Sequence, residues 1–175
     1  NLDKEKKKYK FNKYVEEIKL DQISYKKFYK KKIYVINVKY LNSKSYVHKC
    51  FQVAFKIIKN GLTYKLINGP INKTKTLNKK YLGVTELVAK NFKQDKFAML
   101  IYNKSLSVCP VTTHLPLNLV AKKITKKIIK EKIIVINDFY NNILGFKPKI
   151  AVLGLNPHCE SILQFNEDEK IIRPV

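Results

Sequence analysis

Apolar residues recur along this chain at two different spacings, and that alternation is the feature that most limits its fold. From residue 45 to 60 and from 125 to 144 they fall three or four positions apart, which is typical of a helix with one buried face. Asn42 can cap the first of these helices, and Gly61 and Gly145 stand where the two helices must end. The sequence therefore predicts two amphipathic helices.

Blocks rich in β-branched and aromatic residues lie between the helices and predict strands. They cover residues 32–40, 64–68, 97–102, 106–112 and 149–154. A third helix is expected over 83–93, with Thr85 in its first turn. Because strands alternate with helices, we expect an α/β fold with a largely parallel sheet, in which ligands collect at the carboxyl ends of the strands.

The first 31 residues mix charged and aromatic side chains without a clear period. We expect a poorly defined basic segment over 1–31, with a short helix around 13–20, and one α/β region over 32–175. No apolar run approaches the roughly 20 residues of a membrane helix, and the start lacks the apolar core of a secretion signal, so we expect a soluble cytoplasmic protein. The three cysteines form no Cys-x-x-Cys pair, which indicates reduced thiols.

The chain is strongly basic, with 36 Lys and Arg residues against 13 Asp and Glu and a formal charge of +23. Among the basic residues only Arg173 is an arginine, whereas recognition of bases and phosphates favours the planar guanidinium. We therefore expect a lysine-coated, solvated surface and no nucleic-acid partner. A non-catalytic basic module that binds polyanions stays open as an alternative.

Two of the three histidines stand where chemistry would collect in such a fold. His114 and His158 each follow a predicted strand, and each has a proline nearby, in His-Leu-Pro and Asn-Pro-His. Proline stiffens a loop, and a stiff loop can present an imidazole as a metal ligand. Their spacing matches no local metal motif, so ordinary hydrogen-bonded loop residues are the alternative interpretation.

The stretches around these histidines resemble a known family. Residues 110–117 (PVTTHLPL) and 154–158 (GLNPH) are similar to two signature stretches of the 4-hydroxythreonine-4-phosphate dehydrogenase family of pyridoxal phosphate biosynthesis. Residues 68–73 (NGPINK) are similar to the family's strand-turn stretch that ends in lysine, and residues 83–86 (GVTE) to its Gly-His-Thr-Glu. The likeness runs from about residue 32 to residue 175.

The resemblance implies an isocitrate/isopropylmalate dehydrogenase-like α/β fold and a homodimer with active sites at the subunit interface. It implies NAD-dependent oxidation and decarboxylation of 4-hydroxythreonine 4-phosphate, with a divalent metal cation of the zinc, magnesium or cobalt type. His114 and His158 match two of the family's three metal ligands, and Thr85 matches a substrate-binding threonine. Because the third ligand falls beyond residue 175, we expect an internal fragment that is inactive alone, and we assign no catalytic base.

Two positions depart from the family pattern. Val84 replaces a histidine and can neither donate a hydrogen bond nor carry a proton, so a related dehydrogenase of phosphorylated four-carbon sugar acids is the alternative substrate class. Cys159 stands where a small residue is usual, and we interpret it as a free thiol. The chain has no Gly-x-Gly-x-x-Gly, which counts little against NAD because the family does not rely on that motif.

Overall fold

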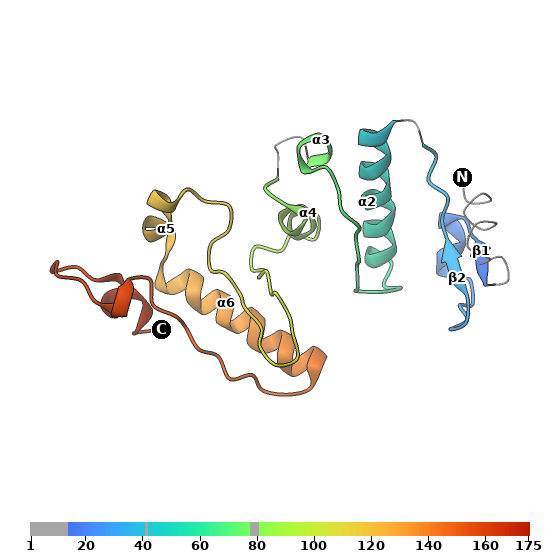
Figure 1. The fold of residues 1–175 in the computed structure, drawn as a ribbon. Helices are drawn as coiled ribbons and strands as arrows, with labels where there is room; N and C mark the ends of the chain where they lie inside the picture. The colour runs from blue at the N-terminus through green and yellow to red at the C-terminus, as the bar shows by residue number, and fades with distance from the viewer. Residues whose placement is uncertain (1–13, 41, 78–80) are drawn as a thin grey trace. The chain divides into compact units, whose positions relative to one another are not determined.

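The computed structural model describes residues 14–40, 42–77 and 81–175 (Figure 1). Contacts divide the chain into two compact units, Asn1–Lys80 and Tyr81–Val175. Among the described residues, the buried apolar side chains of the first unit are Ile18, Ile23, Phe51, Phe55 and Leu77, and those of the second are Leu87, Ala89, Ile124 and Ile129. No helix in these parts of the chain is both long and apolar enough to cross a membrane.

The first unit begins with two short strands that pair in parallel. β1 (Val15–Glu17) lies beside β2 (Ile33–Val35), with Val15 opposite Ile33 and Glu17 opposite Val35. Between them the chain forms the 3-10 helix η1 (Leu20–Ser24). Parallel strands need such a crossover, because a tight turn can connect only antiparallel neighbours.

The short helix expected around 13–20 is wrong for the described residues of that range. Residues 15–17 form β1 instead, because their backbone finds a partner in β2 and because Glu16 faces two lysines. The Glu16 carboxylate lies 2.5 Å from Lys26 Nζ and 2.9 Å from Lys32 Nζ. These hydrogen-bonded ion pairs lower the pKa of Glu16. Contacts between residues distant in sequence thus overrode the local preference.

The helix α2 (Ser43–Lys59) confirms the first predicted amphipathic helix. The Asn42 side chain accepts a hydrogen bond from the backbone N–H of Ser45 at 2.9 Å, which is the expected cap. Phe51 and Phe55 stand one turn apart on its buried face, with ring centroids 5.8 Å apart. The short helix α3 (Lys73–Leu77) packs against α2 and was not expected from the sequence.

The regular elements described in the second unit are helices, joined by long irregular segments. The unit contains α4 (Val84–Asn91), α5 (Leu117–Lys123) and α6 (Lys126–Phe139), and α6 continues into one π-helical turn, η2 (Tyr140–Leu144). α4 and α6 confirm the other two predicted helices, whereas α5 was not expected. Gly61 and Gly145 both have positive φ, 76° and 79°, so each ends its helix in the left-handed conformation that glycine adopts without strain.

A hairpin-like segment packs along α6. Ile101 and Val108 exchange two backbone hydrogen bonds, of 2.8 and 3.0 Å, and form a single antiparallel bridge. Further along, the Tyr140 hydroxyl donates to Ser107 Oγ at 2.9 Å. The two segments predicted as strands over 97–102 and 106–112 therefore meet, but at one bridge only.

The other predicted strands do not form among the described residues. Residues 64–68 and 149–154 are irregular, and only 33–35 of the block 32–40 pairs with a neighbour. A strand needs a hydrogen-bonded partner, and these segments have none in the described parts of the chain. Their apolar side chains are consequently exposed: Ile67 is 97% and Leu153 83% exposed. The α/β class is confirmed by the helices and the parallel pair, but the expected larger sheet is absent there.

Candidate functional site

His114 lies in the connection between the Ile101–Val108 bridge and α5, two residues before the helix cap Pro116. Its φ is 58°, in the left-handed region, and the residue is exposed. Its imidazole makes no hydrogen bond to any other described residue. A ring nitrogen is thus available to a ligand, and metal binding by an imidazole needs one such nitrogen.

His158 is the middle residue of a single 3-10 turn, η3 (Pro157–Cys159). Its φ is 56°, and that of the following Cys159 is 57°, so two successive residues without glycine's freedom are left-handed. His158 is exposed, and its ring too has no hydrogen-bond partner among the described residues.

The shared left-handed backbone sets the two histidines apart from ordinary loop residues. Among the described residues, the non-glycine positions with positive φ are Lys93, His114, His158 and Cys159. This conformation costs an L-residue about 1–2 kcal/mol, and such strain concentrates at functional sites. Nothing in the sequence pattern indicated it, although histidine occurs in this region several-fold more often than most other non-glycine residues.

A buried carboxylate holds the loop that carries His158. Asp168, only 4% exposed, begins the π-helical turn η4 (Asp168–Ile172). Its Oδ1 accepts the backbone N–H of Leu155 at 2.7 Å, and its Oδ2 accepts the backbone N–H of Asn156 at 3.0 Å and the Asn156 side-chain amide at 2.9 Å. Burial alone would raise the pKa of Asp168, but these hydrogen bonds outweigh it and hold the pKa below its ordinary value.

Asn166 ties the same loop on the far side of His158. Its amide Nδ2 donates to the carbonyl of Cys159 at 3.2 Å, while its Oδ1 accepts the backbone N–H of Asp168 at 2.8 Å. The backbone is therefore held both before and after the histidine. Neither Asp168 nor Asn166 was singled out by the sequence; a signal was available only in the cluster of acidic residues that follows the GLNPH stretch.

The loop begins at Gly154, where the surrounding atoms leave no room for a larger residue. A Cβ built there would lie 3.0 Å from Asp168 Oδ1 and would overlap the sulfur of Cys159. The glycine that opens the GLNPH stretch is thus favoured by the close approach of the buried carboxylate and the neighbouring thiol.

Thr85 is half-buried in the first turn of α4, as the sequence predicted. Helix α4 has no side-chain cap, so backbone N–H groups of its first turn remain available. The Glu86 carboxylate folds back over this end, 2.9 Å from the point where a Cβ on Gly83 would lie. A negative charge stabilises the N-terminus of a helix, and the Glu86 carboxylate places one at the N-terminus of α4.

The structure does not complete a metal site. Nowhere in residues 14–40, 42–77 and 81–175 do three or more His, Cys, Asp or Glu side chains gather as they would around a metal ion. His114 and His158 lie in the same unit and have the chemistry of ligands, but the described residues supply no third ligand beside them. The cysteines are free thiols, as expected, and burial raises the pKa of Cys109 above its ordinary value.

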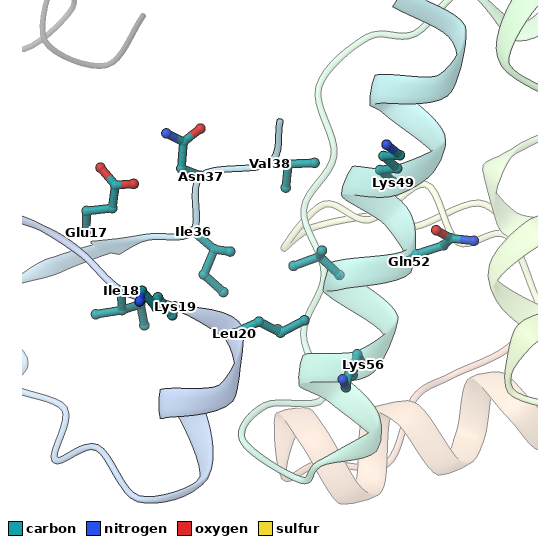
Figure 2. Close-up of a pocket in the computed structure, with 11 residues that line it drawn as sticks. Glu17, Ile18, Lys19, Leu20, Ile36, Asn37, Val38, Lys49, Gln52 and Lys56 are labelled. Carbon is teal, nitrogen blue, oxygen red and sulfur yellow. The ribbon is translucent and has the colours of Figure 1, made fainter. Parts of the chain in front are cut away.

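A separate groove of about 500 Å³ opens in the first unit, between the end of β1 and α2 (Figure 2). Ile18, Leu20 and Val53 contribute apolar surface, and Lys49 and Lys56 extend from α2 along its edge. Its lining contains no His or Cys, and Glu17 is its only carboxylate. None of the predicted site residues lines this groove, so we place no catalytic chemistry there.

Comparison with known proteins decides the family. A model of the family described as pyridoxal phosphate biosynthetic protein PdxA matches residues 3–175. The chain belongs to the PdxA family. This confirms the resemblance that rested on the GVTE, PVTTHLPL and GLNPH stretches.

Curated relatives of this PdxA-family chain are named as dehydrogenases of two different phosphorylated substrates. A 4-hydroxythreonine-4-phosphate dehydrogenase of Hydrogenobaculum is 39% identical over 63% of this chain and 38% of its own length. A D-threonate 4-phosphate dehydrogenase of Pectobacterium atrosepticum is 31% identical over 73% of this chain and 40% of its own.

Solved structures share the fold. A crystal structure of 4-hydroxythreonine-4-phosphate dehydrogenase from Klebsiella pneumoniae matches with a TM-score of 0.72 at 25% identity, over 92% of this chain and 54% of its own. A structure from Salmonella typhimurium gives a TM-score of 0.73 at 24% identity, with the same coverage. The chain thus spans about half the length of these solved relatives.

Proposed function

We propose that this chain supplies part of the active site of an NAD-dependent, divalent-metal-dependent oxidoreductase that oxidises and decarboxylates 4-hydroxythreonine 4-phosphate in pyridoxal phosphate biosynthesis. The observation that carries the proposal is the pair His114 and His158, each exposed, without a hydrogen-bond partner among the described residues, and held in a strained left-handed backbone. Membership of the PdxA family and the names of the relatives support the reaction.

In this proposal His114 and His158 donate imidazole nitrogens to a zinc, cobalt or magnesium-type ion, and a third ligand comes from outside the described residues. When bound there, such an ion would lower the pKa of the substrate hydroxyl and would polarise the ketone that loses CO2. The chain's own contribution is to supply two ligands from loops whose backbone conformation is fixed at each histidine. We propose a cytoplasmic homodimer with an isocitrate dehydrogenase-like fold for the whole protein.

Thr85 is proposed to bind the substrate phosphate. Its hydroxyl and the N–H groups of the first turn of α4 are donors suited to an anion, and the Glu86 carboxylate that folds over this end would turn away when the phosphate binds. The adjacent Val84 adds no donor, so the phosphate would have fewer hydrogen bonds here than in relatives with histidine at this position.

The test is NAD reduction by the full-length protein containing this chain, with substrate and divalent metal. Because both histidines have positive φ, the informative replacements are His114→Asn and His158→Asn, which keep a residue type that tolerates this backbone. His48→Asn is the matched control: His48 is an exposed histidine of α2 whose Nε2 lies 3.3 Å from Gln52 Nε2.

We expect both site variants to lose activity by at least about 100-fold and to bind metal more weakly, while His48→Asn retains both. The 175-residue chain alone is expected to show no turnover. Folded site variants as active as the wild type would contradict the proposal.

A second candidate substrate is supported by one relative and one residue. The Pectobacterium atrosepticum relative is named for D-threonate 4-phosphate, a phosphorylated four-carbon sugar acid, and Val84 lacks the donor that the amino-acid substrate would meet. Comparing kcat/KM for the two substrates on the same protein decides between them. Salt-sensitive polyanion binding, with no turnover of either, would instead favour the basic binding module.

A further inference from the structure

We infer that Asp168 is a positioning residue for His158: its buried carboxylate sets the backbone from which the imidazole is presented. The inference rests on the proposed function in assigning a metal to His158, but the positioning itself follows from the contacts of the loop. No motif around the histidines pointed to Asp168.

The contacts act on the residues immediately before the histidine. Oδ1 of Asp168 accepts the N–H of Leu155, and Oδ2 accepts two N–H donors of Asn156. Pro157 follows, and its ring fixes φ. The three residues leading to His158 therefore have little freedom, and the direction of the His158 Cα–Cβ bond, from which the imidazole extends, is restrained.

The carboxylate can do this because it is itself held. Asp168 is 4% exposed, and its own N–H is bound by the Asn166 side chain, which also binds the carbonyl of Cys159. No lysine, arginine or histidine forms an ion pair with Asp168 among the described residues, so loop N–H groups alone compensate its charge. A charged acceptor makes stronger hydrogen bonds than a neutral one, which suits a loop that must stay strained.

Comparison of Asp168→Asn with Glu169→Gln separates the loss of the loop hydrogen bonds from the loss of one negative charge. Asp168→Asn keeps the shape but turns one acceptor oxygen into a donor that faces N–H groups. Glu169→Gln removes the same charge one position along, where the exposed carboxylate pairs with Arg173 at 3.0 Å and with no other residue in the described part of the chain. Asn166→Ala is a milder, charge-neutral change that loosens the same loop.

The first measurement is made without metal, from the backbone resonances of His158. We expect Asp168→Asn to move them away from left-handed values and to speed amide exchange at Leu155 and Asn156, with Asn166→Ala shifting them less and Glu169→Gln not at all. Unchanged amides in α6 show that the fold is intact. His158 resonances identical to the wild type in a folded Asp168→Asn would overturn the inference.

The second measurement is Co²⁺ affinity of the full-length protein. We expect Asp168→Asn to weaken it by about 10- to 100-fold and Glu169→Gln by less than about twofold. Where His158→Asn weakens Co²⁺ binding, wild-type affinity in Asp168→Asn, despite faster exchange at Leu155, would make Asp168 purely structural and overturn its positioning role. If His158→Asn binds Co²⁺ as the wild type does, the proposed function fails, and the metal-free resonances still decide the positioning.

Discussion

Lys132 Nζ donates a hydrogen bond of 2.5 Å to the backbone carbonyl of Phe97 and lies 4.9 Å from the centroid of the Phe97 ring. One lysine of α6 therefore binds both the main chain and the side chain of the segment that leads toward His114. Phe97 lies 35 positions before Lys132, so this contact joins α6 to a segment that is distant in sequence.

Replacing this lysine tests whether the contact stabilises the second unit. Lys132→Ala is expected to lower the free energy of unfolding by about 2–4 kcal/mol, the sum expected for a charged hydrogen bond and a cation–π contact. Lys130 is an exposed lysine of the same helix, and Lys130→Ala should change the free energy of unfolding by less than about 0.5 kcal/mol. Urea denaturation measures both, and equal losses would argue against the contact.

The Asp168 pKa predicts a pH dependence of stability. Because the folded pKa is depressed below 3.8, the ionised carboxylate stabilises the fold above that pH, and the contribution is lost as pH falls through the folded pKa. The difference in unfolding free energy between wild type and Asp168→Asn should therefore be constant from pH 7 to pH 5 and shrink below pH 3.8. Urea denaturation over this range checks it; a difference that grows on acidification would be the wrong sign.

The left-handed backbone of His114 predicts an unusual ranking of substitutions. His114→Val should unfold more easily than His114→Asn by about 1–2 kcal/mol, because a β-branched residue is strained at positive φ whereas asparagine is tolerated. The residue is exposed, so packing should contribute little to the comparison. The thermal unfolding midpoints of His114→Val and His114→Asn check this ranking. A valine variant as stable as the asparagine variant would show that the loop backbone relaxes.

The cap of α6 offers a simpler test. Thr125 accepts the backbone N–H of Ile128 at 3.3 Å, so Thr125→Ala should cost about 1 kcal/mol. Thr125→Ser keeps the hydroxyl and should retain most of that stability. Helix unfolding monitored by circular dichroism compares them, and identical midpoints for all three proteins would count against the cap.

Val84→His tests the substrate assignment made under the proposed function. An added imidazole at the first residue of α4 should raise kcat/KM for 4-hydroxythreonine 4-phosphate by about tenfold, the effect of one hydrogen bond to a charged group. Val84→Ala adds no donor and is the control. Steady-state kinetics on the full-length protein give the answer, and equal effects of the two variants would exclude the donor explanation.

The helices could be predicted from sequence because their signals are local. Apolar spacing gave α2 and α6, Asn42 is the cap, and Gly61 and Gly145 have the left-handed φ expected of helix ends. The strands could not, since a strand depends on what lies beside it: β1 formed where a helix was expected, and residues 149–154 have no partner among those described.

The candidate site was predictable only in part. Motif resemblance identified His114, His158 and Thr85, but neither the backbone strain at the histidines nor the role of Asp168 has a local signature. Asp168 is ten positions from His158 and reaches the loop only through the fold. Residues that position a functional group are held by tertiary contacts, and these are what sequence patterns omit.

The exposed apolar residues of the irregular segments also affect how the protein behaves in solution. Ile67, Leu153 and Ile162 present large apolar surfaces to water on a chain that carries a net charge of +23. At low ionic strength, mutual repulsion keeps such molecules apart, whereas salt shortens the range of that repulsion to about 10 Å at 0.1 M. The colloidal stability of this chain is therefore set by a competition between its lysines and its unpaired strand segments, and added salt favours self-association.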